Sequence, residues 1–417
     1  MSLFTSTDFA SACASGTDWR DTSKNVLEKL DDIRTKSDQF NFGFIYISDH
    51  LAEDATSILN LFKSVLKIEN WVGSIAMGVI GGNESLTDQP AISAMIGRFP
   101  EDSFCIFPDS NNDETASSDE PTSKPTLDDW LAKHQPILSV IHGDPMAEED
   151  PQGILKDLEA ATDAFIVGGL TSSRGAHYQI ANTLHDNSIS GAFFADTVPV
   201  STTLSQGCQP IGTFHTITKA DENVILELDD KRAIDVLQGD LKTLAAKQLG
   251  KVADDLIGDI ENLASSDTIP DAFKSLFQGQ VHVALPFSQS DQKDYLVRNI
   301  MGIDPDEGSI AISEHISVGD NILFVERHDK SLSADLSAAL VNLRRRVQAE
   351  RGCFEPKGAL YISCVARGFG QDENTQNSEI NLINDIIGPV PLTGFYAGGE
   401  INNARIYGYT GVLVLFF

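Results

Sequence analysis

One order of secondary-structure signals occurs three times along this chain, and it constrains the fold more than any other feature. Each time an apolar strand ends in polar residues, a helical pattern follows, and a second strand leads through a glycine pair to a third strand. Repetition of a whole order is a stronger signal than any single Gly-Gly. The first strands are FGFIYISDH (42–50), QPILSVIHGD (135–144) and GALYISCVARG (358–368), and the glycine pairs are 81–82, 168–169 and 398–399.

This order predicts an α/β protein. A helix between two strands of one sheet is typical of parallel strands, while the tail strands can form hairpins, so the sheets are expected to be mixed and flanked by helices. We expect three related strand–helix–strand–hairpin units. The polar turn and the Gly-Gly turn of a unit should meet at the same sheet edge, where ligands of α/β sheets usually bind. Gly82 should then lie near Asp49, and Gly169 near His142.

The length of 417 residues allows two domains. An amphipathic helical pattern with Val26, Leu27 and Leu30 follows a possible cap at Asp21 or Ser23, which predicts a helical leader. The acidic, proline-containing stretch 109–126 is typical of a surface loop, and the mostly helical stretch 233–277 is broken by glycine and proline. We therefore expect a leader at 1–40, one domain at 41–235 and another at 236–417.

Charge and cysteine usage exclude several classes of function. The chain has 61 acidic residues against 30 Lys+Arg, a formal net charge of −31, which disfavours nucleic acid and anionic membranes as partners. Neither a secretory signal nor a long apolar span is found, so we expect a cytoplasmic protein. Five widely spaced cysteines without a CxxC pair favour reduced thiols over disulfides or zinc, and no motif for a cofactor or metal is present.

Four segments together resemble the FIST family over roughly residues 40–417. They are GCQPIGTFHTITKADENVILELDDKRAIDVL (207–237), YLVRNIMGIDPDEGSIAISEHISVGDNILFVER (295–327), GALYISCVARG (358–368) and VPLTGFYAGGEI (390–401). The resemblance implies a FIST N-terminal and a FIST C-terminal domain, which occur in bacterial signalling proteins and, in eukaryotes, joined to an F-box. A 40-residue leader is too short for an F-box and a further domain, so a stand-alone sensor of the bacterial type is expected.

The family resemblance implies an intracellular sensory module that binds a small ligand, such as an amino acid or a related metabolite, and signals through a partner protein. We place the ligand pocket where SCVARG faces the turn GFYAGGEINN. Glu400 and Arg367 carry the opposite charges that the ammonium and carboxylate of an amino acid would need. The predicted ligand-binding residues are Cys364, Arg367, Thr393, Tyr396, Gly398, Gly399, Glu400 and Asn402.

Two alternatives remain open from the sequence. A hydrolase-like enzyme would use Cys364 as its nucleophile, but no base is evident beside it, and a buried structural cysteine is the more common case. A protein-recruiting scaffold would need no ligand. Arg367 could equally pair with Glu400 or Asp144 instead of binding a ligand, and for Arg174 pairing with another turn is favoured.

Overall fold

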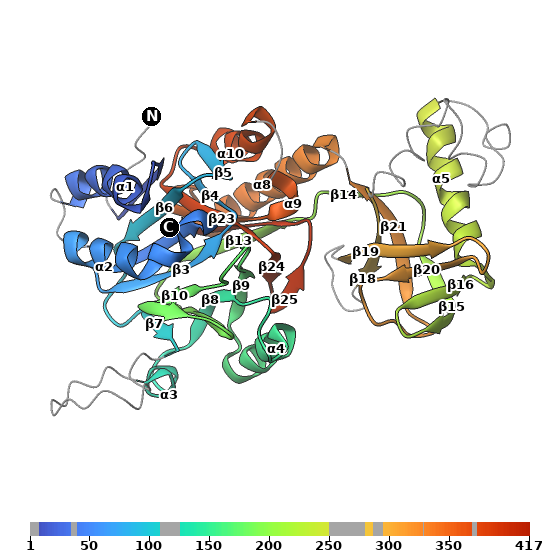
Figure 1. The fold of residues 1–417 in the computed structure, drawn as a ribbon, viewed down its shortest axis with the longest axis horizontal. Coiled ribbons are helices and arrows are strands. Elements are labelled where there is room, and N and C mark those ends of the chain that lie inside the picture. The colour runs from blue at the N-terminus through green and yellow to red at the C-terminus, as the bar shows by residue number, and fades with distance from the viewer. Residues whose placement is uncertain are drawn as a thin grey trace. The chain divides into compact units, whose positions relative to one another are not determined.

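The structure is a computed structural model that describes residues 8–34, 40–108, 126–249, 280–286, 295–327, 329–368 and 373–417. The chain divides into two compact units (Figure 1). Unit 1 consists of Met1–Gln206 together with Leu336–Phe417, and unit 2 of Gly207–Asp335. Unit 2 is therefore an insertion between two parts of unit 1.

Unit 1 is built on three six-stranded sheets. In order across the first sheet, the strands are β1 (Phe9–Ser15), β6 (Ala91–Gly97), β2 (Phe42–Ser48), β3 (Asn70–Ala76), β10 (Gln179–Ala181) and β11 (Thr183–His185). Those of the second are β7 (Phe104–Phe107), β12 (Ile189–Ala195), β8 (Pro136–Gly143), β9 (Phe165–Leu170), β24 (Gly399–Asn402) and β25 (Arg405–Tyr407). Those of the third are β13 (Val200–Ser205), β26 (Gly411–Phe416), β22 (Gly358–Cys364), β23 (Leu392–Ala397), β4 (Gly78–Gly81) and β5 (Glu84–Thr87).

Each sheet contains one parallel pair, β2/β3, β8/β9 or β22/β23, next to antiparallel strands. Helices connect the two strands of every pair, as a crossover requires. They are η1 (Asp49–Asp54) and α2 (Ala55–Leu66), then α4 (Pro151–Thr162), then α9 (Val365–Gly368) and α10 (Glu373–Ile387). The α/β class with mixed, helix-flanked sheets is confirmed. That the three units are related stays a prediction.

The hairpin that follows the second strand of each crossover joins a different sheet. The β4–β5 hairpin pairs with β23, the β10–β11 hairpin with β3, and the β24–β25 hairpin with β9. Consequently the chain leaves one sheet and enters another directly after each second strand. Side chains from different sheets are brought together at these crossings.

The prediction that the three glycine pairs mark one repeated turn is wrong. They occupy three different places: the end of the β4–β5 hairpin (81–82), the interior of β9 (168–169) and the passage from β23 to β24 (398–399). Gly169 does pair with His142 in β8, as expected for that unit. Gly81, however, pairs with Thr393 in the third sheet, because its hairpin has left the first sheet.

One glycine position does repeat across the three crossovers. The second strand of each has a glycine close to the first strand, at Gly73, Gly168 and Gly394. A Cβ atom there would lie only 1.7, 1.8 and 1.7 Å from the carbonyl oxygens of Ile45, Ile141 and Tyr361 respectively. No side chain fits at such a distance, so each parallel pair depends on glycine at this position.

Unit 1 has one inner core and three outer ones. The inner core lies between the three sheets and contains buried rings from all of them, among them Phe44, Phe194 and Phe395. Outside, α1 (Trp19–Arg34) and α2 pack on the first sheet, α3 (Leu127–Leu131) and α4 on the second, and α8 (Asp329–Arg351) and α10 on the third (Figure 1). Both faces of each sheet are thereby removed from water, as the long apolar runs of the strands demand.

Local signals explain how the helices begin and end. Asp150 caps α4 by accepting hydrogen bonds from the backbone N–H groups of Gln152 and Gly153, and Pro151 occupies the first helical position. The helix α2 ends at Lys67, whose φ of 57° lies in the left-handed region. The crossover helices therefore start and stop where their own sequence directs.

In its described residues, unit 2 is an antiparallel barrel with a helix packed on its core. Its pairings run from β21 (Asn321–Arg327) through β15 (His215–Asp221), β16 (Val224–Leu228), β20 (Ser309–Ile312), β19 (Tyr295–Asp304) and β18 (Val281–Pro286), and β18 pairs with β21 again. The short strands β14 (Cys208–Pro210) and β17 (Lys231–Arg232) pair with β21 and β16. The helix α5 (Ala233–Leu249) packs on the apolar core of this barrel.

The structure adds two observations on the organisation of the chain, while the expected domain bounds stay a prediction. The leader contains the predicted helix, α1, but it also supplies β1, which pairs along its whole length with β6. The compact units also do not divide at residue 235, because β13 before unit 2 pairs with β26 at the far end of the sequence. The acidic stretch 109–125 and residues 250–279 lie outside the described residues.

Among the described helices, none is both long and apolar enough to span a membrane.

Candidate functional site

Most of the predicted site residues gather at the carboxyl ends of β22 and β23 in unit 1, whereas Thr393 lies near the start of β23. Cys364 ends β22, Arg367 follows in α9, and Glu400 lies on β24, directly after the chain leaves β23. Gly398 is exposed, but the other predicted side chains are buried, from 0% exposed for Glu400 to 8% for Asn402. The site is thus an interior polar cluster of unit 1.

Arg367 forms its ion pair with Glu379 of α10, a residue that the sequence did not single out. Nε donates to Glu379 Oε1 over 2.8 Å, Nη2 donates to the same oxygen, and Nη1 donates to the carbonyl oxygen of Ser205 over 3.1 Å. Burial alone would lower the pKa of Arg367, but the Glu379 carboxylate outweighs it and holds that pKa above its usual value. Arg367 is therefore a fixed cation, and neither Glu400 nor Asp144 is its ion-pair partner.

The second oxygen of Glu379 is also satisfied. Oε2 accepts hydrogen bonds of 3.0 Å from the hydroxyls of Tyr361 and Ser363. These two hydroxyls alternate along β22 and so lie on one face of the strand. Two hydroxyls at this spacing in a buried strand are the signal that could have indicated a polar partner on the covering helix.

Glu400 is the least satisfied group of the cluster. Oε2 accepts hydrogen bonds of 2.8 Å from both the backbone N–H and the hydroxyl of Thr410. Oε1 is buried and has no nitrogen or oxygen donor among the described residues; its neighbour is the thiol of Cys364. Burial raises the pKa of Glu400 from 4.5 to about 7, against the hydrogen bonds from Thr410 that favour the charged form.

Cys364 is a poor nucleophile in this setting. Burial, and after it the negative charge of Glu400, raises the pKa of the thiol well above its ordinary value. The attacking species of a cysteine enzyme is the thiolate, which an electropositive and partly exposed environment favours. Glu400 lies beside the thiol, where a general base would have to lie, but its negative charge destabilises the thiolate.

The glycines at 398 and 399 serve a close approach between protein segments. The Gly398 N–H donates to the carbonyl oxygen of Leu170 over 3.0 Å, and a Cβ at Gly398 would lie 2.9 Å from the carbonyl oxygen of Thr171. At Gly399 a Cβ would lie 2.9 Å from the side chain of Ile406. The chain can therefore cross from the third to the second sheet only with a minimal side chain here.

Of the remaining predicted residues, Thr393 and Tyr396 lie on opposite faces of the third sheet, and Asn402 lies in the second sheet. Thr393 is hydrogen-bonded to the hydroxyl of Ser93 over 2.8 Å, within unit 1 but away from the Arg367 cluster. Tyr396 packs on Gly368, beside Arg367 and Glu379. The odd spacing of these two strand residues accounts for the separation. Asn402 lies two residues beyond Glu400 on the same strand, where it pairs with Arg405 of β25.

Arg174 joins two turns, as expected from the sequence, and its partners are Asp49 and Asp88. Its guanidinium binds both oxygens of Asp49 over 2.8 Å and an oxygen of Asp88 over 2.6 Å. Asp144 instead caps its own turn, accepting from the backbone N–H groups of Met146 and Asn187. Arg174 is thus a structural clamp between the second and first crossovers.

Among the described residues, the cluster has an acceptor for a hydrogen-bond donor or a cation, but no unpaired group that could bind an anion. Arg367 and Glu379 neutralise each other, and the hydroxyls of Tyr361 and Ser363 are engaged. Glu400 Oε1 remains as an acceptor whose charge changes near neutral pH. Removing one member of a buried ion pair typically costs about 3–5 kcal/mol, so the Arg367–Glu379 pair is expected to hold this end of the sheet together.

Comparison with known proteins agrees with this architecture. Residues 41–231 match the FIST N domain, and residues 256–403 match the FIST C domain. An uncharacterized protein of Mycobacterium tuberculosis is 30% identical over 233 residues, and one of Mycobacterium bovis is 29% identical over 227 residues. These matches cover 51% and 52% of this chain and 50% of each relative, so the chain spans about half the length of the curated relatives it matches.

The two domain matches extend over most of the chain, and the segments that carry them include the crossover strands and the Glu400 strand described above. FIST domains are associated with signal transduction. The chain belongs to the FIST family.

Proposed function

We propose that this protein is a small-ligand sensor in signal transduction and that its ligand binds at Glu400. The observation that carries the proposal is the buried Oε1 atom, for which the described residues supply no nitrogen or oxygen donor. A carboxylate removed from water costs free energy unless each oxygen is hydrogen-bonded or paired. Groups kept in such environments, with strongly shifted pKa values, are concentrated at functional sites.

The charges of the cluster indicate which chemical group of the ligand would bind to Glu400. Glu400 would pair with an ammonium or another hydrogen-bond donor, such as the amine of an amino acid or a related metabolite. Arg367 would not bind the ligand's carboxylate, because its guanidinium is already bound to Glu379. The amine of the ligand is therefore the group that Glu400 recognises in this proposal.

Burial of the site suits a sensor. Glu400 is 0% exposed, so a ligand reaches it only when the surrounding segments open. A ligand that binds one of two conformations more tightly shifts the population toward that conformation. We propose that this shift is the signal and that a partner protein of the signalling pathway recognises it.

A thermal-shift screen of amino acids and other primary amines at pH 8 tests the proposal, because Glu400 is then ionised. A ligand at a hundred times its dissociation constant should stabilise the protein by about 2.7 kcal/mol. Glu400→Gln should weaken the binding at least tenfold, which is about 1.4 kcal/mol. Glu355→Gln, the same change at an exposed position of unit 1, is the matched control and should bind like the unaltered protein.

Two results would count against the proposal. If no amine stabilises the protein, the scaffold alternative is favoured. If a ligand binds Glu400→Gln as tightly as the unaltered protein, the ligand site lies elsewhere.

A further inference from the structure

A separate cavity lies at the opposite end of β22 from the Glu400 cluster. It has a volume of about 400 Å³, within the usual range for small-molecule sites of roughly 300–1,000 Å³. Lys357, which precedes β22, and Phe416, which ends β26, both line it, whereas the Glu400 cluster lies beyond the other end of the strand. The proposed function does not use this cavity.

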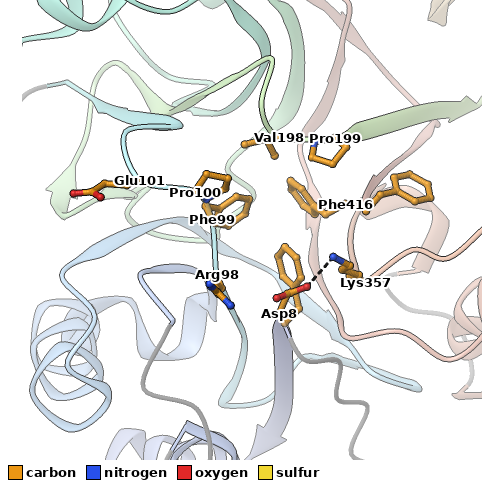
Figure 2. Close-up of a pocket in the computed structure, with 11 residues that line it drawn as sticks. Asp8, Arg98, Phe99, Pro100, Glu101, Val198, Pro199, Lys357 and Phe416 are labelled. Carbon is orange, nitrogen blue, oxygen red and sulfur yellow. Dashed lines mark ion pairs between the residues drawn. The ribbon is translucent and has the colours of Figure 1, made fainter. Parts of the chain in front are cut away.

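Three buried aromatic rings form its inner wall. The Phe9 ring stacks on Phe416 with centroids 5.4 Å apart, and Phe99 meets both rings edge-on at 5.4 and 5.6 Å. These rings are only 1–4% exposed, so they are held by the core around them. Figure 2 shows Phe99 and Phe416 next to each other among the residues that line the hollow.

Backbone hydrogen bonds fix the walls in place. The N–H of Arg98 donates to the Asp8 carbonyl over 2.8 Å, and the N–H of Lys357 donates to the Phe416 carbonyl over 2.8 Å. A third bond of 3.0 Å joins the Phe417 N–H to the carbonyl of Pro199. The cavity is therefore preformed, which reduces the ordering cost of binding.

Among the described residues at the rim, one cation is left without an ion-pair partner. Lys357 Nζ is paired with Asp8 Oδ2 at 2.8 Å, drawn as a dashed line in Figure 2. Arg98 is exposed, and no carboxylate of the described residues forms an ion pair with it. In Figure 2 its side chain lies on the same side of the hollow as the Lys357–Asp8 pair, while Glu101 extends away. A free guanidinium beside aromatic rings is notable on a chain with twice as many acidic as basic residues.

We propose that this cavity binds a small aromatic carboxylate. The aromatic ring of the ligand would pack against the partly exposed Phe417 and Pro199, because the inner rings are already packed on one another. Its carboxylate would accept a forked pair of hydrogen bonds from the Arg98 guanidinium. Asp8 and Glu101 disfavour a doubly charged phosphate, and Arg98 is the one unpaired cation among the described lining residues, so a monoanion is favoured.

Titration of the full chain with 4-fluorophenylacetate, followed by ¹⁹F NMR, tests this inference. The fluorine resonance should shift and broaden in a saturable way. Arg98→Gln should weaken the binding by about tenfold or more. Arg345→Gln removes the same charge at another exposed arginine of unit 1 and should leave the affinity unchanged. The neutral analogue 4-fluorophenylacetamide should bind the unaltered protein about tenfold more weakly or worse.

Three results would overturn the inference: no saturable change at millimolar concentration, equal affinity for the acid and its amide, or equal affinity of the Arg98→Gln variant and the unaltered protein. Glu400→Gln should bind 4-fluorophenylacetate normally. The two proposed sites therefore fail or succeed independently of each other.

Discussion

Glu400→Gln should make this protein more stable at alkaline pH and leave its stability unchanged at acidic pH. Glutamine retains a carbonyl oxygen that can accept both hydrogen bonds from Thr410, at the place where Glu400 Oε2 accepts them over 2.8 Å. It carries no charge at any pH. The variant therefore keeps the local contacts and removes only the ionisation of a buried group.

The magnitude follows from the pKa of Glu400 in the two states. It is about 7 in the folded chain and 4.5 in the unfolded chain. Below pH 4.5 both states are protonated, so the carboxyl does not affect stability. As the pH rises from 4.5 to 7 the unfolded chain releases this proton and the folded chain retains it, which favours unfolding. At 1.36 kcal/mol per pH unit, the difference between about 7 and 4.5 amounts to about 3 kcal/mol above pH 7.

Urea unfolding of both proteins at several pH values between 4.5 and 8.5 measures the effect. The free energies of unfolding should agree at pH 4.5 and separate by about 3 kcal/mol at pH 8, with the variant more stable. Other titrating groups contribute equally to both proteins and cancel in the difference. Glu355→Gln should show no such pH-dependent separation.

A difference that does not change with pH would refute the assigned pKa of Glu400. A variant that becomes less stable than the unaltered protein as the pH rises would show that Arg367 stabilises an ionised Glu400. In that case the reasoning from burial would be wrong.

Two further predictions concern the neighbouring strands. Cys364→Ala should cost only about 1 kcal/mol of stability. Mass spectrometry should find that a thiol reagent at neutral pH labels the exposed Cys353 well before Cys364. Rapid labelling of Cys364 together with loss of a measurable activity would revive the enzyme alternative. Gly168→Ala should abolish folding or lower the melting temperature strongly, because φ is 147° and the added Cβ would lie 1.8 Å from a carbonyl oxygen. Gly175→Ala, where a Cβ meets nothing within 4 Å, should change stability by less than about 0.5 kcal/mol, and equal effects of the two changes would contradict this account.

The sequence by itself was sufficient for the α/β class and the three crossovers. Strand and helix signals within a crossover are local, since apolar alternation, caps and turn residues act over a few positions. Motif order along the chain was also sufficient to indicate the FIST family. The expectation that Cys364 is a buried thiol followed from the same local pattern.

Pairings between distant segments were decided by the tertiary structure. The hairpin that contains Glu400 pairs with β9 of the second sheet. Arg367 pairs with Glu379 of α10, the helix that covers the third sheet. The sequence also did not predict β1, which precedes the leader helix and pairs with the distant β6, or the insertion of unit 2 between β13 and β26.

The physical reason is that a strand edge or a buried charge has no local preference among chemically suitable partners. Any exposed strand edge can accept a hairpin, and any nearby carboxylate can neutralise Arg367, so packing of the whole chain makes the choice. Local sequence therefore determined which elements form and which polar residues lie at their ends. Only the tertiary structure decided that Arg367 is fully engaged while one oxygen of Glu400 is left without a nitrogen or oxygen donor among the described residues.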